Sequence, residues 1–555
     1  MLQTKITSSL EKIFLDEKIE NYPTLERITA LKGERVCVQY AYIYDNTEEE
    51  QRLIYPYRLK PIIIGSLAEY ATIRNVRHVP VPMPVNPAGM DDNYLRTAPG
   101  LFPDILEDLR YDGKVTLTAF ALSALWIEIE IPENISAGEH TLTVTLNCEN
   151  YGTGVNTVAI DVIDAVIPKE DIYFTQWFHC DGLAQYYNVD VWSDKHWEIV
   201  ENYARVAVKN GMNMILTPVF TPPLDTAVGG ERLTTQLVGV TVEAGKYTFD
   251  FTLLDKWIAM CDRIGMKYLE ISHFFTQWGA AHAPKIMATV DGEYKKIFGW
   301  ETEATGAEYS AFLRQFVTEL IAHLKSSGND TRCFFHVSDE PGLAHLENYK
   351  AAKAIIADLL EDYKIMDALS KIDFYNTGAL NNPIPSNNHV HDFIDAKVPG
   401  LWTYYCVSQW KDVSNRYQSM PAWRNRSIGM QMYKYNIVGF LHWGYNFYNN
   451  QFSDSPINPY LETTCDFAFP AGDAYSVYPG PDGECLESTR QKVFYEALQD
   501  IKAMKLCETL YSHDEVVAAI EEVFGKELRF DTCTKDAGTM LAIREKINMM
   551  IKEKV

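Results

Sequence analysis

The chain has 555 residues, 47% of them hydrophobic, which is enough apolar material for more than one packed domain. Its net charge of −25 and pI near 5.0 argue against nucleic acid and anionic membranes as partners, because both attract basic surfaces. The ten cysteines show no CxxC spacing, which predicts buried thiols of a reducing compartment. Neither a signal-peptide pattern nor an 18-residue apolar run occurs, so we expect a cytoplasmic protein that spans no membrane.

Residues 1–167 predict a β-sandwich. Runs rich in β-branched and aromatic residues alternate in part with polar residues and are separated by turn clusters such as "IPENISAGEH". These runs cover residues 34–43, 55–66, 124–132 and 140–148. We place the domain boundary near Pro168.

Residues 168–487 change to alternating strands and helices. Strands are expected at 171–178, 212–220, 266–275, 333–337, 371–378, 399–407, 437–448 and 474–480. Amphipathic helices are expected between them, the first at 194–211 with Asp194 as its N-cap. This count of repeated units predicts a (β/α)8 barrel of the TIM type. Residues 488–555 predict a helical C-terminal extension that begins at an N-cap, Ser488.

Two adjacent carboxylates, Asp339 and Glu340, end the expected fourth strand in "FFHVSDEPG". The active site of a (β/α)8 barrel lies at the carboxyl ends of its strands. Carboxylates there can act as general acid and electrostatic partner in glycoside cleavage, and their repulsion raises one pKa. The structural alternative is a helix-capping Asp followed by a first-turn Glu near Pro341.

The expected seventh strand does not supply a second catalytic carboxylate. Many retaining barrel glycosidases carry their nucleophile after the seventh strand, but the stretch expected there, 437–446, holds His442, Trp443 and Asn446 without any carboxylate. Substrate assistance is one alternative, in which the 2-acetamido oxygen of the sugar attacks the anomeric carbon. The Glu of the pair then protonates the leaving oxygen, and the Asp orients the acetamido nitrogen. A glycosidase acting on sugars without an acetamido group stays open, with Asp181, Asp225 and Asp473 as candidates for its separate base.

Four stretches in this order resemble glycoside hydrolase family 123 and the domain family numbered 4091. They are "YLRTAPGLFPDIL" (94–106), "FFHVSDEPG" (334–342), "IVGFLHWGYN" (437–446) and "AGDAYSVYPGPDG" (471–483). The characterised relatives are retaining exo-β-N-acetylgalactosaminidases that use an Asp-Glu pair. The resemblance implies that Asp339 orients the acetamido group and that Glu340 is the acid/base. It also implies that a tyrosine near Tyr375, on the expected fifth strand, holds the acetamido carbonyl.

Further residues at expected strand ends are candidates for carbohydrate binding. Aromatic rings there suit sugar faces, although alternation along a strand also sends some of them into the core. Histidines and amides can hydrogen-bond sugar hydroxyls, although a buried imidazole satisfied by the protein is the alternative reading. The candidates are Trp402, Tyr404, Trp443, His179, His273 and Asn446.

No metal or other cofactor is expected. His389, His391 and Asp392 in "HVHD" lack matching ligands at a recognisable spacing, and no phosphate-binding glycine motif occurs. The expected partner is a carbohydrate, and the pattern indicates no oligomeric state. A non-catalytic carbohydrate-binding protein on the same fold is the rival, because fold alone does not confer activity.

Overall fold

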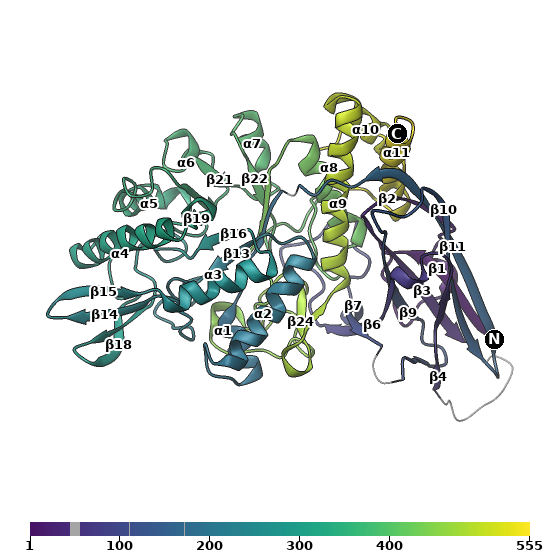
Figure 1. Cartoon of the computed structure of the whole chain (residues 1–555), viewed down its shortest axis with the longest axis horizontal. Coiled ribbons are helices and arrows are strands. Elements are labelled where there is room, and N and C mark those ends of the chain that lie inside the picture. Colours follow the sequence, from purple (N-terminus) through teal and green to yellow (C-terminus); the bar gives the residue numbers. More distant parts are fainter. Residues whose placement is uncertain (45–55, 110–111, 171) are drawn as a thin grey trace.

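The protein is described by a computed structural model that covers residues 1–44, 56–109, 112–170 and 172–555. Residues 55 and 171, at the edges of two expected strands, lie outside the described residues. Figure 1 shows a strand-and-helix barrel on one side, β-sheets on the other, and the last helices of the chain where the two regions meet.

The N-terminal region forms two sheets. The five-stranded sheet has the order β1 (Leu2–Ser8), β3 (Arg35–Tyr44), β9 (Ser123–Glu130), β6 (Ala71–Val81) and β7 (Gly100–Asp108). The four-stranded sheet has the order β2 (Arg27–Lys32), β11 (Gly152–Val166), β10 (Gly138–Cys148) and β5 (Ile62–Ile64). Side chains from both sheets, among them Tyr40, Ile127, Leu142 and Ile160, share one buried apolar cluster. This is where the sequence predicts a β-sandwich.

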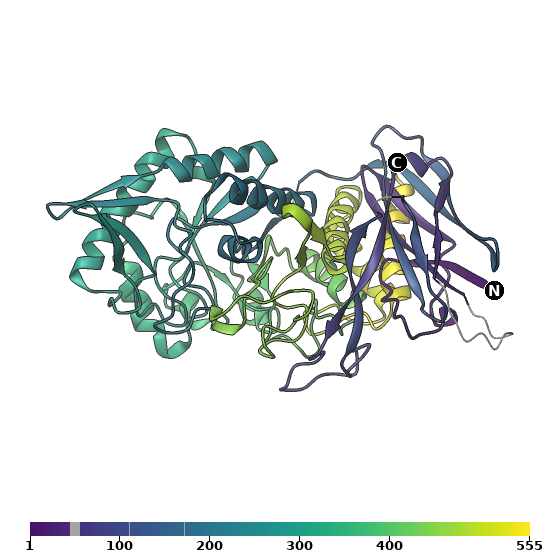
Figure 2. The ribbon, with the colours of Figure 1, turned by 90° about the horizontal axis from the view of Figure 1, so that it is seen from below.

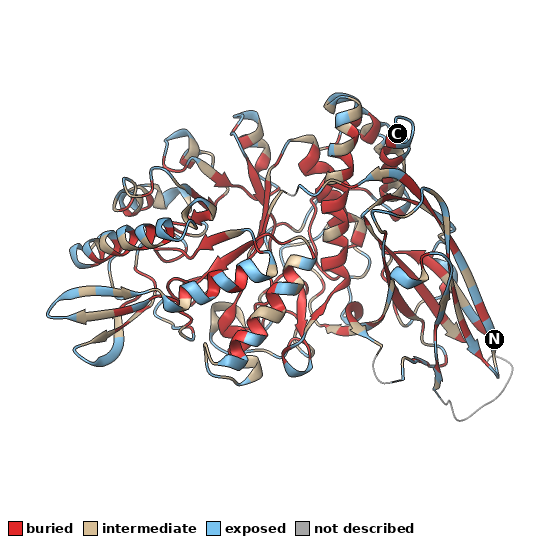
Figure 3. Ribbon diagram, viewed as in Figure 1, coloured by how far each residue is buried: buried red, intermediate tan, exposed pale blue. Residues whose placement is uncertain are grey.

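The middle of the chain forms an almost closed barrel of eight parallel strands. In chain order they are β12 (Tyr173–Gln176), β13 (Met214–Thr217), β16 (Tyr268–Ile271), β19 (Cys333–Phe335), β20 (Lys364–Ala368), β21 (Asn382–Ile384), β22 (Trp402–Tyr404) and β23 (Gly439–His442). Each strand pairs with the next along the chain except β21 with β22, and β23 pairs with β12. A parallel bridge between Ser386 and Tyr404 connects β21 with β22. The barrel strands are buried along most of their length (Figure 3).

The predictions of two barrel strands, at 371–378 and 474–480, are wrong. Residues 371–378 contain a short helix, α6 (Asp373–Asn376), and the fifth strand is β20, whose buried charge Asp367 makes it unlike an ordinary core strand. The sixth strand, β21, has three residues and was not expected. The stretch 474–480 contains β24 (Val477–Pro479), which pairs antiparallel with β25 (Cys485–Glu487) outside the barrel. The stretches predicted as the sixth and seventh strands, 399–407 and 437–448, therefore contain the seventh and eighth strands, β22 and β23.

Helices follow most of the barrel strands. They are α1 (Cys180–Tyr187), α2 (Asp194–Lys209), α3 (Thr252–Ile264), α4 (Ala307–Ser326), α5 (Leu346–Ala354), α7 (Val390–Asp395) and α8 (Ala422–Lys434). The N-cap of α2 is Ser193, whose hydroxyl accepts the His196 N–H, and not Asp194 as expected. A small sheet with the order β15 (Lys246–Asp250), β14 (Gly239–Glu243), β17 (Ile286–Val290) and β18 (Glu293–Phe298) projects from the barrel (Figure 1).

The last three helices lie between the barrel and the N-terminal sheets (Figure 2). They are α9 (Thr489–Leu510), α10 (His513–Phe524) and α11 (Ala537–Lys552), and Ser488 caps α9 as expected. Phe494 of α9 stacks on Phe174 of β12 with ring centroids 4.7 Å apart. Arg544 of α11 pairs with Glu34 beside the sheets at 2.8 Å and with Asp500 of α9 at 2.9 Å. The C-terminal helices therefore contact both regions.

None of the helices in the described ranges is long and apolar enough to cross a membrane. All ten cysteines lie in described residues and are unpaired, and all but Cys485 are buried.

Candidate active site

A cavity of about 200 Å³ lies at the carboxyl end of the barrel. Every barrel strand except β21 contributes lining residues from its end or from the loop that follows it. They are Trp177, Leu224, Asp225, Gln277, Trp278, Asp339, Glu340, Ala368, Tyr404, Cys406, Val407, Leu441, Trp443, Gln451 and Phe469. Aromatic rings and a few carboxyl groups thus converge on one space, which is typical of a small-molecule site.

Asp339 and Glu340 both line this cavity, although they are adjacent in sequence. Glu340 has a left-handed φ of 42°, which is uncommon for a residue other than glycine. Its N–H donates to the Ala368 carbonyl at 3.0 Å, and the Asp339 carbonyl accepts from Trp278 N–H at 2.8 Å. Neighbouring loops therefore hold the backbone turn at the pair. The capping alternative is not seen, because α5 begins at Leu346 and the turn before it at Leu343.

The two carboxyl groups favour retention of a proton. Burial and then the charge of Glu340 raise the pKa of Asp339 well above its ordinary value. Glu340 as a residue is exposed, but the walls around its carboxyl group bury that end and raise its pKa. Because the groups are adjacent, the proton belongs to the pair, which titrates in two steps. The pair is thus built to hold one proton where separate carboxylates would hold none.

Tyr404 reaches the pair, whereas Tyr375 does not line the cavity. The Tyr404 hydroxyl donates to Glu340 Oε1, and this bond partly offsets the raised pKa of Glu340. Tyr375 lies in α6, half-buried, and not on a barrel strand as expected. The hydroxyl next to the pair therefore comes from the seventh strand rather than from the residues after the fifth.

Trp402 and Trp443 occupy opposite ends of the barrel. Trp402 begins β22 and stacks on Tyr173, the first residue of β12, with centroids 5.3 Å apart. It packs so close to Gly439 that a Cβ there would lie 2.1 Å from the indole. Trp443 follows β23, lines the cavity and donates its indole N–H to Asp473 Oδ2 at 2.9 Å. Trp443 is therefore placed to meet a sugar, whereas Trp402 fills the barrel interior.

His179 and Asn446 lie behind the cavity wall. The His179 ring interacts with the Trp443 carbonyl and with Arg232 Nη2, each at 3.0 Å. The Asn446 side chain accepts from His179 N–H at 2.9 Å and donates to its carbonyl at 3.1 Å. Both residues are buried and absent from the cavity lining, so they join β12 to β23 rather than face a ligand.

A buried charge network lies inside the barrel. His336, three residues before Asp339, is 2.7 Å from Glu270 Oε1 and 3.0 Å from Asp367 Oδ1. Two carboxylate partners require both ring nitrogens to carry protons. Burial lowers the pKa of His336, but the bonds to Asp367 and Glu270 outweigh it and raise the pKa to about 10. Glu270 also accepts the Trp177 indole N–H at 2.7 Å, so the network orients a cavity wall.

His273 stacks on His336 with ring centroids 4.4 Å apart, and both of its nitrogens are buried without a hydrogen-bond partner. Donor atoms of His273, His336 and Asp367 lie within 4.8 Å of one another, the one such grouping in the described ranges. A protonated His336 has no lone pair to offer a metal, so its two carboxylate bonds favour a hydrogen-bond network there. His273 is not in the cavity lining.

Three aspartates were expected near strand ends, and only Asp225 lines the cavity. Asp181 is buried and bound at both oxygens by the Arg232 guanidinium, at 2.7 and 2.8 Å. Asp473 is buried and orients Trp443; burial raises its pKa to about 7 despite nearby Arg416. Asp225 is half-buried, and burial raises its pKa to about 6.

The sequence reading missed two further tryptophans of the cavity, Trp177 and Trp278. Each follows a correctly expected strand, the first and the third, so the rule applied to Trp443 would have found them. Trp278 has a φ of 60° and is 39% exposed, at the rim. Its ring meets that of Phe452 edge to face with centroids 5.9 Å apart.

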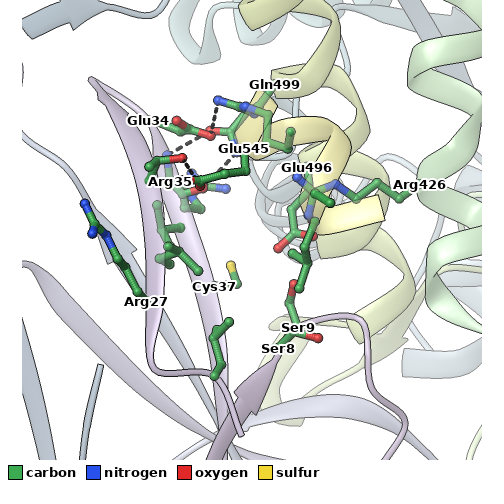
Figure 4. Close-up of a pocket in the computed structure, with 17 residues that line it drawn as sticks. Ser8, Ser9, Arg27, Glu34, Arg35, Cys37, Arg426, Glu496, Gln499 and Glu545 are labelled. Atoms are coloured by element: carbon green, nitrogen blue, oxygen red, sulfur yellow. Dashed lines mark hydrogen bonds and ion pairs between the residues drawn. The ribbon is translucent and has the colours of Figure 1, made fainter. Parts of the chain in front are cut away.

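A second cavity, of about 320 Å³, lies between the five-stranded sheet and the C-terminal helices (Figure 4). Its charged groups are mostly paired with one another. Arg426 pairs with Glu496 at 2.9 Å, and the Gln499 side chain accepts Arg35 N–H at 2.8 Å. This space is larger than the barrel cavity, but its Glu496 and Glu34 form ion pairs with Arg426 and Arg544, so we place the chemistry in the barrel.

Comparison with known proteins gives a family for this architecture. The catalytic-domain model of glycoside hydrolase family 123 matches residues 177–507. A family 123 glycoside hydrolase from Clostridium perfringens, described in work on glycolipid glycan hydrolysis, superposes with a TM-score of 0.73 at 14% identity. The alignment covers 100% of this chain and 98% of that one, and it shows a shared fold.

A family 5 mannosidase from Rhizomucor miehei gives a TM-score of 0.31 at 12% identity, over 60% of this chain and 95% of that one. No curated protein sequence matches the chain. The likeness to the domain family numbered 4091 stays a prediction. Because the family model covers more than half of the sequence, the chain belongs to glycoside hydrolase family 123 and is a glycoside hydrolase.

Proposed function

We propose that this glycoside hydrolase is a retaining exo-β-N-acetylgalactosaminidase-like enzyme with substrate-assisted catalysis. One observation carries the proposal: two adjacent carboxyl groups line one cavity, where burial raises the pKa of both. A cavity of about 200 Å³ at the carboxyl end of the barrel has the size for one terminal sugar, which supports exo action. The sugar identity follows the resemblance to characterised family members.

In the proposed first step, Glu340 donates its proton to the glycosidic oxygen. The acetamido oxygen attacks the anomeric carbon as the bond to the leaving group breaks, and a cyclic oxazolinium forms. The Asp339 carboxylate accepts the acetamido N–H and stabilises the positive charge. In the second step Glu340 takes a proton from water, whose oxygen opens the ring at the anomeric carbon and restores the β configuration.

The absence of a protein nucleophile after β22 or β23 supports this division of work. The cavity residues that follow these strands are Cys406, Val407, Trp443, Gln451 and Phe469, none of them a carboxylate. Adjacent residues cannot easily act from opposite faces of the ring at the roughly 5 Å carboxyl spacing of a protein-nucleophile mechanism. When the sugar supplies its own nucleophile, the protein needs to supply only the carboxyl pair, Asp339 and Glu340.

The test is turnover of aryl β-N-acetylgalactosaminides against the matching galactosides. The proposal expects hydrolysis of the acetamido sugar alone and strong inhibition by a thiazoline mimic of the cyclised intermediate. Comparable turnover of the galactoside, together with indifference to the thiazoline, would point to a protein nucleophile instead. Asp225 favours this second candidate function, a glycosidase for sugars without an acetamido group, because it is another carboxyl group in the cavity.

Tyr404→Phe should move the alkaline limb of the pH dependence of kcat/KM to higher pH. The Tyr404 hydroxyl stabilises ionised Glu340, so its removal raises the pKa of Glu340 and keeps this acid protonated up to a higher pH. Tyr375→Phe is the matched control, because it removes the same group outside the cavity and should leave the limb in place. A limb that stays fixed in Tyr404→Phe, or moves to lower pH, would contradict this assignment.

A further inference from the structure

Asp225 occupies a loop that is fixed from several sides. It follows β13, and its φ of 42° is left-handed. Its N–H donates to the Gln277 side chain, and its carbonyl accepts from the Ser453 hydroxyl at 2.8 Å. Gln277 also donates to the Thr226 carbonyl at 3.0 Å. The loops after β16 and β23 therefore hold Asp225 in an unfavourable backbone conformation, as happens where a side chain must be aimed at a site.

Within the described ranges, the carboxyl group of Asp225 forms no ion pair, unlike that of the buried Asp181. Its Oδ2 accepts the Phe452 N–H at 3.2 Å. Within the described ranges no Lys, Arg or His forms an ion pair with it, whereas Asp181 is bound by Arg232. An ionised carboxylate has about four acceptor positions, so in the part of the chain that the structure describes most of those on Asp225, which lines the cavity, are left for a ligand.

We propose that Asp225 accepts hydrogen bonds from ring hydroxyls of the terminal sugar and so determines which sugar the enzyme prefers. A sugar offers hydroxyl donors, and bonds from hydroxyls to a carboxylate are stronger than those between neutral groups. A site built to bind a hydroxyl also discriminates strongly against an analogue without it, because the acceptor is then left buried and unpaired. Asp225 is thus assigned to recognition, and Asp339 and Glu340 to the chemistry. This inference rests on the proposed function.

The test is a cycle between Asp225→Asn and monodeoxy substrates. Asparagine keeps the shape and the contact to Phe452 N–H but removes the charge. The wild-type enzyme should lose about 10- to 100-fold in kcat/KM on one of the 3-deoxy, 4-deoxy or 6-deoxy aryl glycosides. Asp225→Asn should show a similar loss on the parent sugar and little further loss on that analogue. Asp291→Asn is the matched control, since Asp291 also has a left-handed φ, 49°, but is exposed on the β17–β18 hairpin.

Two kinetic results would overturn the inference. One is Asp225→Asn with wild-type kcat/KM on the parent sugar. The other is a deoxy penalty that is the same in both proteins at every position, which would fit a base or nucleophile role with uniform loss of kcat.

A binding measurement separates this inference from the proposed function. Trp177, Trp278 and Trp443 line the cavity, so N-acetylgalactosamine binding should change tryptophan fluorescence. If no glycoside is turned over, the proposed function fails. The Asp225 inference then stands only if the wild type binds the sugar at least about 10-fold more tightly than Asp225→Asn. Equal binding, or binding by neither protein, would overturn it.

Discussion

Glu340→Gln should lower kcat/KM on alkyl β-N-acetylgalactosaminides by about 10²-fold or more. Glutamine keeps the shape of the side chain but has no proton to donate to the leaving oxygen. On dinitrophenyl glycosides the rate of the first step should fall less, because dinitrophenolate leaves without being protonated. Steady-state kinetics on both substrate types measures the difference.

Glu347→Gln is the matched control for this variant, because Glu347 is an exposed residue of α5 outside the cavity lining and pairs with Lys350. It should retain wild-type kinetics. An unchanged rate of Glu340→Gln on the alkyl glycoside would remove Glu340 from the mechanism.

Asp339→Asn should lower kcat on the acetamido sugar by on the order of 10²- to 10³-fold, the size seen when one preorganised stabilising group is removed from a transition state. The charge that stabilises the oxazolinium is lost, whereas substrate binding is less affected. The same change removes the repulsion that raises the pKa of the pair. The alkaline limb of the residual activity should therefore move to lower pH, opposite to the shift expected for Tyr404→Phe.

Pre-steady-state and pH-rate measurements on Asp339→Asn separate these effects. A fall in kcat without any movement of the alkaline limb would mean that the two carboxyl groups do not share a proton. Asp291→Asn again serves as the control for a change from Asp to Asn outside the cavity.

Much of the barrel could be predicted from sequence, because most of its strands are short apolar runs followed by amphipathic helices. The carboxylate pair was found for the same reason, since β19 is a clear apolar strand that is followed by "HVSDEPG". The left-handed φ of Glu340 could not be foreseen, because Glu has no intrinsic preference for it and contacts from neighbouring loops impose it. That turn is what brings both carboxyl groups into one cavity.

The misread fifth strand explains the misplaced tyrosine. The strand β20 carries the buried Asp367, a residue rare in core strands, which is tolerated because His336 and the Tyr349 hydroxyl bind it. The aromatic run around Tyr375 looked more like a strand but forms a helix of one turn. The local sequence pattern does not reveal β20 as a strand, because its buried Asp367 is stabilised by His336, which lies 31 positions away in the sequence.

The two ends of a strand are also indistinguishable by composition. Trp402 and Tyr404 share the inward face of β22, two residues apart, yet Trp402 stacks inside the barrel and Tyr404 reaches Glu340. His179 and Asn446 lie at the correct end, but hydrogen bonds to the protein satisfy them. Sequence position predicted proximity to the site, and only the three-dimensional structure separated lining residues from supporting ones.

The central claim is that the sugar supplies its own nucleophile while Asp339 and Glu340 assist. The most direct measurement compares aryl β-galactosaminides whose N-acetyl group carries zero, one, two or three fluorine atoms. Fluorine withdraws electrons from the acyl oxygen and weakens it as a nucleophile. The account predicts that kcat/KM falls steeply with each fluorine, whereas equal rates across the series would contradict it.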